Sequence, residues 1–145
     1  YKDKSFITKY RNYFDFVFFS PPYFQLELYK GKNQSTERYK TYEEWLEKYW
    51  RQTVKLCKHS LKSNKLMMYI ISGYTDNTSI NLEKDMNAIT KEEGFILVKK
   101  LDMVGNNVGI TKHRKLKESV FIFNNGRSSI ETDVNSYYKR IKECK

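Results

Sequence analysis

The chain has 145 residues and a formal net charge of +10, with 27 Lys and Arg against 17 Asp and Glu. This length allows one domain or part of one, residues 1–145, with its own core, and the charge favours a polyanionic partner such as nucleic acid. Two distant cysteines and two histidines, His59 and His113, give no basis for a disulfide framework, a metal site or a Ser-His-Asp triad, and both histidines are expected at the surface.

No signal peptide and no apolar run of membrane-spanning length is visible in the sequence. The sequence therefore predicts an intracellular, cytoplasmic protein in a reducing compartment, without a membrane partner.

In the first third of the chain, the residue pattern predicts one strand between two polar segments. Residues 1–12 are polar and basic, which indicates a loop or a frayed helix. Residues 14–19 are apolar apart from Asp15, a pattern typical of a central strand covered on both faces. Residues 25–40 lack periodicity and are expected to form a mobile loop.

A long helix is predicted over residues 42–61, because Thr41 and Glu44 form a capping-box pattern before an amphipathic stripe. Trp45 and Trp50 lie on that stripe and are expected in the core. Residues 62–64 then read as a spacer before a second buried strand, residues 66–71.

The second half continues the alternation of helix and strand. A helix is predicted over residues 81–93, with Ser79 as its cap and Gly94 at its end. Strands are predicted over residues 95–101 and 118–123, separated by a basic loop, and residues 124–145 read as a polar tail. The pattern predicts an α/β fold with a mainly parallel sheet.

The most specific motif is Ser20-Pro21-Pro22-Tyr23, directly after the first strand. Two prolines fix φ and remove two backbone donors, so the neighbouring carbonyls take a preset geometry. The Ser20 side chain and the carbonyls of Ser20 and Pro21 can accept hydrogen bonds from an exocyclic amino group, while Tyr23 stacks on the base. The plainer alternative is a turn after a buried strand.

These residues resemble the Asp/Asn/Ser-Pro-Pro-Tyr/Phe/Trp motif of S-adenosylmethionine-dependent DNA methyltransferases that modify adenine N6 or cytosine N4. The continuation is similar to a phage and bacterial branch, in which a polar loop with Gln-Ser leads to a Tyr-x-Thr-Tyr-Glu-Glu-Trp-Leu helix, here residues 39–46. The resemblance covers most of residues 15–123. It implies a base flipped out of the duplex and the catalytic residues Ser20, Pro21, Pro22 and Tyr23.

The resemblance also implies a fold: the second half of a Rossmann-like methyltransferase sheet, mainly parallel with an antiparallel last strand. The family binds S-adenosylmethionine at a Gly-rich turn after an earlier strand, and this chain has no Gly-x-Gly. Only Ser20 is a partial cofactor-binding candidate. The chain is then a fragment, the partner of a second chain carrying the cofactor half, or a degenerate domain.

Basic residues outside the motif are candidates for contact with phosphates that flank the target base. With Tyr23, the predicted nucleic-acid-binding residues are Lys30, Lys32, Arg38, Lys112, Arg114, Lys115 and Lys117.

Two alternatives to DNA methylation stay open. The chain can be a catalytically inactive methyltransferase-like module that binds nucleic acid or scaffolds a complex. It can also act on an RNA base or on a glutamine side chain, although enzymes of the last kind usually carry Asn where this chain has Ser20.

Overall fold

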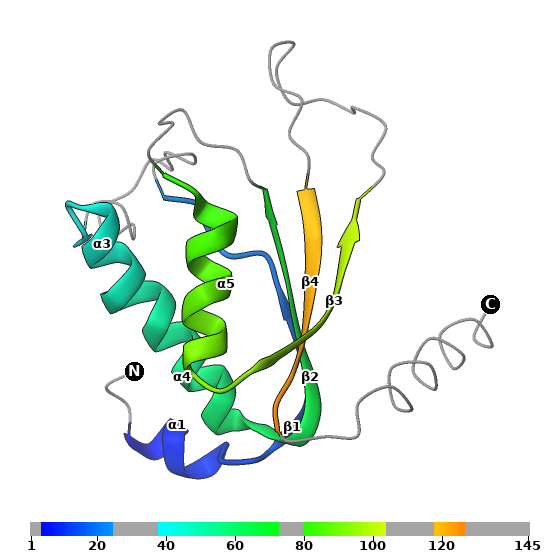
Figure 1. Ribbon diagram of the computed structural model, residues 1–145. Coiled ribbons are helices and arrows are strands. Elements are labelled where there is room, and N and C mark those ends of the chain that lie inside the picture. The colour runs from blue at the N-terminus through cyan, green and yellow to red at the C-terminus, as the bar shows by residue number, and fades with distance from the viewer. Residues whose placement is uncertain (1–3, 25–37, 73–79, 104–117, 127–145) are drawn as a thin grey trace.

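The computed structural model describes residues 4–24, 38–72, 80–103 and 118–126. They form a four-stranded sheet of order β1-β2-β4-β3, with helices packed on one of its faces (Figure 1). The elements in chain order are α1 (Lys4–Lys9), β1 (Phe14–Phe19), α3 (Tyr42–Trp45), the π-helix η1 (Leu46–Trp50), α4 (Arg51–Ser60), β2 (Leu61–Ser72), α5 (Leu82–Glu92), β3 (Ile96–Asp102) and β4 (Glu118–Asn124).

The direction of the strands confirms the predicted fold class. β1 pairs in parallel with β2, and β4 lies between β2 and β3 and is antiparallel to both. Three strands therefore share one direction, and the last strand of the chain opposes them. The carboxyl ends of β1, β2 and β3 lie at one end of the sheet, called the carboxyl end below.

The helical segment of residues 42–60 contains a π-helical turn that brings two tryptophans to the same side. In a regular α-helix each residue advances about 100° around the helix axis, so side chains five residues apart point about 140° away from each other. The Arg51 N–H bonds to the Leu46 carbonyl five residues earlier, which widens the turn. Trp45 and Trp50 are both fully buried, as expected from the sequence.

The predicted capping box is half formed. Thr41 Oγ1 accepts a hydrogen bond from the Glu44 N–H at 3.1 Å, as the pattern requires. The Glu44 carboxylate instead accepts from the N–H of Lys40, one residue before the cap.

The second strand begins five residues earlier than predicted. β2 starts at Leu61, so residues 62–64 are part of the strand and not a spacer before it. Phe14 pairs with Leu61 while Phe16 pairs with Leu66, which places the extra residues in a bulge around Asn64, whose φ is 60°. Polar side chains do not prevent pairing, because the ladder uses only backbone groups.

The cap of α5 also differs from the prediction. Asn81, and not Ser79, is the capping residue, because its side chain accepts a hydrogen bond from the Lys84 N–H at 3.0 Å. Gly94 follows the helix with φ +83°, the left-handed conformation that glycine adopts at low cost.

The expectation that β1 is covered on both faces is wrong for the described residues. Among the strands that the structure describes, β1 lies at the edge of the sheet and pairs with β2 alone. Phe19 packs with Trp50 and Tyr69 on the helix side. On the opposite face, the stacked rings of Phe16 and Phe18 remain 44% and 55% exposed.

The start of the predicted polar tail belongs to the sheet. Asn124 is the last residue of β4, and the buried Asn125 side chain donates to the Leu61 carbonyl at 2.8 Å. Residues 127–145 lie outside the described ranges. Among the described residues, no helix combines the length and the apolar character needed to cross a bilayer.

Candidate active site

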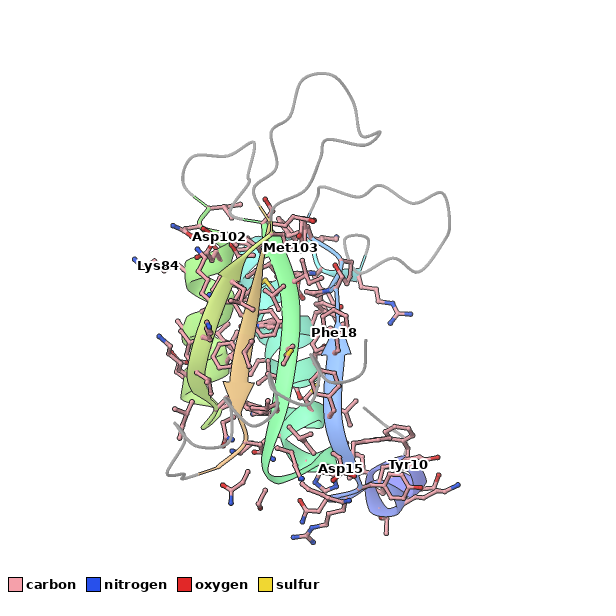
Figure 2. The ribbon with its side chains drawn as sticks, turned by 90° about the vertical axis from the view of Figure 1, so that its right-hand side faces the viewer. Tyr10, Asp15, Phe18, Lys84, Asp102 and Met103 are labelled. Atoms are coloured by element: carbon pink, nitrogen blue, oxygen red, sulfur yellow. The ribbon has the colours of Figure 1, made fainter. Side chains whose placement is uncertain are left out.

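The Ser20-Pro21-Pro22-Tyr23 motif lies at the carboxyl end of the sheet, directly after β1. Figure 2 shows β1 running upwards from Asp15 at its lower end to Phe18, and Asp102 and Met103 mark the end of β3 at the top of the sheet. Open α/β sheets bind their ligands at this end. The fold therefore places the motif at the end of the sheet where folds of this class bind ligands.

The four motif residues differ in exposure. Ser20 is exposed, Pro21 is buried and Pro22 is half-buried, and both prolines follow trans peptide bonds. Tyr23 is only 5% exposed and belongs to the hydrophobic core. Ser20 is thus ready to accept a hydrogen bond, whereas a base can stack on Tyr23 only after the surrounding groups open.

Aromatic rings on both sides of the motif hold it against the helix layer. The Phe19 ring centroid lies 6.1 Å from those of Trp50 and Tyr69. After the motif, the Phe24 ring lies 5.5 Å from Tyr42 and 5.9 Å from Trp45. The motif is therefore held at both ends by packed rings, which limits the movement of Ser20.

Tyr42 connects α3 to α5 beside the motif. Its hydroxyl donates to Asp85 Oδ2 at 3.0 Å. Burial and, secondarily, the Asp85 carboxylate raise the pKa of the Tyr42 phenol far above its ordinary value, so the phenol stays protonated and remains a donor. Sequence reasoning missed this pair, because no local pattern joins residues 43 positions apart.

A second polar contact, which is buried, joins the sheet to the helix layer. The Tyr69 hydroxyl donates to Asn87 Oδ1 at 2.7 Å and lies 3.1 Å from Thr90 Oγ1. This contact links the middle of β2 to α5. The only sequence signal for this contact was the presence of a tyrosine in an apolar strand.

The described residues offer no activated nucleophile or metal cluster. Burial raises the pKa of the Cys57 thiol to about 12, which keeps it protonated near neutral pH. Within the described ranges, no group of three or more His, Cys, Asp or Glu side chains is placed to hold a metal ion.

Most of the predicted nucleic-acid contacts fall outside the described residues. Arg38 is described and exposed, and it lies shortly before Thr41, the cap of α3. The others, Lys30, Lys32, Lys112, Arg114, Lys115 and Lys117, lie in ranges that the structure does not describe.

Asp15 and His59 have structural contacts at the other end of the sheet. Asp15 is paired with Lys62 at 2.8 Å and with Lys65 at 3.7 Å, so its carboxylate is used at this end and not at the motif. His59, expected at the surface, is half-buried, and its Nε2 lies 2.8 Å from the Ile7 carbonyl.

The described residues contain no Gly-rich turn at the carboxyl end of the sheet. The sequence contains no Gly-x-Gly. The two described glycines with positive φ, Gly94 and Gly126, precede β3 and follow β4, which places both at the end of the sheet opposite the motif. What the site offers is an exposed hydrogen-bond acceptor, the Ser20 side chain, three residues before a buried aromatic ring, that of Tyr23.

Comparison with known proteins identifies the fold. No family model matches the sequence, and neither does any curated protein. Three crystal structures of TTHA0409, a candidate DNA modification methylase from Thermus thermophilus, are similar to the chain. The first has a TM-score of 0.59 at 13% identity and covers 86% of this chain and 51% of its own.

A complex of the same protein with S-adenosyl-L-methionine has a TM-score of 0.54 at 15% identity, and a selenomethionine derivative has 0.52 at 14%. Each match covers 86% of this chain, which spans 53% and 52% of those structures, so about half of their length. At this identity the likeness shows the fold alone: the chain is folded like about half of TTHA0409.

Proposed function

We propose that this chain is the base-facing half of an S-adenosylmethionine-dependent methyltransferase that modifies the exocyclic amino group of a flipped DNA base. The observation that carries the proposal is the position of Ser20-Pro21-Pro22-Tyr23 at the carboxyl end of β1, in a sheet with the fold of half a methylase. We propose adenine N6 as the methylated atom slightly ahead of cytosine N4, so the duplex DNA offered as substrate should contain both bases.

The proposed role of the motif is to hold the amino group. The lone pair of such a nitrogen is delocalised into the ring, which makes it a poor nucleophile. Acceptors at the exposed Ser20 side chain and at the carbonyls of Ser20 and Pro21 favour a pyramidal nitrogen with a directed lone pair. Tyr23 stacks on the base once the pocket opens, and Arg38 contacts a flanking phosphate.

The methyl donor is proposed to bind to polypeptide beyond the described residues, with Ser20 as a partial contact. That polypeptide is either another part of the same protein or a second chain. Two observations support it. Among the described strands, β1 is paired on one edge only and carries two exposed phenylalanines on its open face. The chain also spans only about half the length of the similar structures.

Ser20 provides the direct test of this proposal. Methyl transfer from tritium-labelled S-adenosylmethionine to duplex DNA is measured for the complete protein, carrying Ser20→Ala or the control Ser63→Ala. Both serines are exposed, but Ser63 lies in the β2 bulge at the other end of the sheet. We expect Ser20→Ala to lower kcat by about 100-fold, the lower end of the range for loss of one positioned polar group, because the backbone acceptors remain. Ser63→Ala should leave kcat unchanged.

Equal activity of the two variants would contradict the role of Ser20. Absence of methyl transfer by the wild-type protein would favour the second candidate, an inactive module. The buried Tyr23 and the lack of a Gly-x-Gly turn are the observations that favour this candidate.

A further inference from the structure

A cluster of four aromatic rings lies at the amino end of β1, far from the motif. Residues 4–14, called the α1 corner here, contain α1 and the start of β1. The Tyr10 ring lies 4.6 Å from Phe6, 5.3 Å from Tyr13 and 5.5 Å from Phe14, and the Tyr13 and Phe14 rings are 5.2 Å apart.

The α1 corner is firmly attached to the rest of the fold. The Asn12 N–H donates to the His59 carbonyl at 3.0 Å, and the Tyr13 N–H donates to the Ser60 carbonyl at 2.8 Å. His59 Nε2 lies 2.8 Å from the Ile7 carbonyl and so holds α1 against the end of α4. The rings are therefore preorganised, which lowers the entropic cost of binding a partner.

Two of the four rings reach the surface. Tyr13 is 57% exposed and Phe6 is 40% exposed. Tyr13 meets its two aromatic neighbours edge to face, at interplanar angles of 82° and 81°. Large exposed apolar side chains in contact with one another are a common sign of a binding surface.

The charge around these rings is positive. Lys4, Lys9 and Arg11 are exposed, and none of them forms an ion pair within the described part of the chain. No acidic residue occurs between residues 4 and 14. Asp15 follows, but its carboxylate is already shared by Lys62 and Lys65. The α1 corner thus combines exposed rings with cations that no described carboxylate neutralises.

We propose that the α1 corner binds single-stranded nucleic acid. Unpaired bases stack on Tyr13 and Phe6, while Lys4, Lys9 and Arg11 contact phosphates, the combination used by single-strand-binding surfaces. A duplex fits less well, because its bases keep their faces stacked on one another. The surface lies at the opposite end of β1 from Ser20, about 20 Å away for a strand of this length, and its action does not depend on methyl transfer.

Charge reversal tests the phosphate contacts. Binding of a fluorescein-labelled dT15 oligonucleotide to the 145-residue chain is followed by fluorescence anisotropy between about 50 and 200 mM NaCl. The double variant Lys9→Glu/Arg11→Glu should weaken binding at least about 10-fold and flatten the dependence of log K on log salt by about one or more. The control Lys55→Glu/Lys84→Glu makes the same change in charge at exposed helix positions away from the corner.

Ring removal tests the stacking contacts. Tyr13→Ser should weaken dT15 binding about fivefold or more. Phe18→Ser, which removes an equally exposed ring from the open face of β1, should change it less than about twofold. Circular dichroism melting confirms that each variant is folded.

The proposal is overturned if the wild-type chain does not bind dT15, if both charge variants lose affinity equally, or if Tyr13→Ser behaves like Phe18→Ser. A 15-base-pair duplex bound as tightly as dT15 overturns the preference for single strands. None of these outcomes affects the methyl-transfer assay of Ser20→Ala, so failure here and failure of the proposed function are distinguishable.

Discussion

At the scale of single residues, the two buried tryptophans differ in one hydrogen bond. Trp50 Nε1 donates to the Met86 carbonyl at 2.9 Å, whereas Trp45 Nε1 is buried without a partner among the described residues. Both rings are fully buried, so replacement by phenylalanine removes a similar volume. We expect Trp50→Phe to lower the free energy of unfolding by about 1–2 kcal/mol more than Trp45→Phe.

Urea unfolding followed by circular dichroism measures this difference. Trp45→Phe is the matched control, because it removes an unpaired donor that already carries a desolvation cost. Equal losses for the two variants would show that the hydrogen bond of Trp50 contributes little to stability.

Tyr23 is a buried residue of the motif, so its contribution to stability and its role in methyl transfer need separate variants. Because its side chain is 5% exposed, Tyr23→Ala should lower the free energy of unfolding by about 3–5 kcal/mol through loss of core contacts. Tyr23→Phe keeps the ring. If stacking is its function, Tyr23→Phe should retain methyl transfer within about threefold, measured on the complete protein as for Ser20. A loss as large as that of Tyr23→Ala would assign the role to the hydroxyl instead.

At the scale of elements, Arg51 joins the long helical segment to α5. Its guanidinium bonds Glu47 at 2.7 Å, Glu92 at 2.8 Å and Glu93 at 2.7 Å, and only 19% of its side chain is exposed. Arg51→Met should lower the free energy of unfolding by about 1–3 kcal/mol, because it leaves carboxylates without a partner. Lys48→Met is the control, since the Lys48 side chain is 64% exposed and such pairs contribute about 0–1 kcal/mol.

The effect of Arg51→Met should also depend on pH. The hydrogen bond from Arg51 holds the pKa of the Glu47 carboxyl below its ordinary value in the folded protein. A lowered folded pKa contributes stability above the unfolded pKa, about 4.3, and loses it as pH falls through the folded pKa. The difference in the free energy of unfolding between wild type and Arg51→Met, measured by urea unfolding, should therefore be largest near pH 7 and smaller near pH 3.5. A difference in the free energy of unfolding that does not change with pH would mean that Arg51 stabilises the fold through packing and not through charge.

The type and order of the elements could be predicted from the sequence better than their boundaries. Within the described ranges, apolar runs and amphipathic stripes located the four strands and the two longer helices. The start of β2 was missed because residues 62–64 are polar, although their backbone continues the strand through a bulge at Asn64. Such a bulge depends on pairing with β1, which no local pattern records.

At the scale of the whole molecule, the place of the candidate site could be predicted and its surroundings could not. The Ser-Pro-Pro-Tyr motif after an apolar run placed Ser20 at the carboxyl end of β1. The burial of Tyr23 and the Tyr42–Asp85 contact depend on how α3 and α5 pack beside it. The sequence also predicted β1 as a strand covered on both faces, whereas Phe16 and Phe18 are exposed here.

That exposure leads to a prediction about what covers β1. In the isolated chain, Phe16→Thr/Phe18→Thr should change the free energy of unfolding by less than about 1 kcal/mol, because the rings are exposed and Thr suits a strand. The control Phe19→Thr removes a ring that packs on Trp50 and Tyr69, and should cost about 3–5 kcal/mol.

The complete protein should respond differently to the same double variant. If polypeptide carrying the cofactor half packs on the free edge and open face of β1, the two rings are buried there, and their loss should cost several kcal/mol. Urea unfolding of the isolated chain and of the complete protein, each with and without the double variant, measures the contrast. An equally small effect in both would mean that Phe16 and Phe18 stay in solvent, and that the cofactor half is joined somewhere other than at β1.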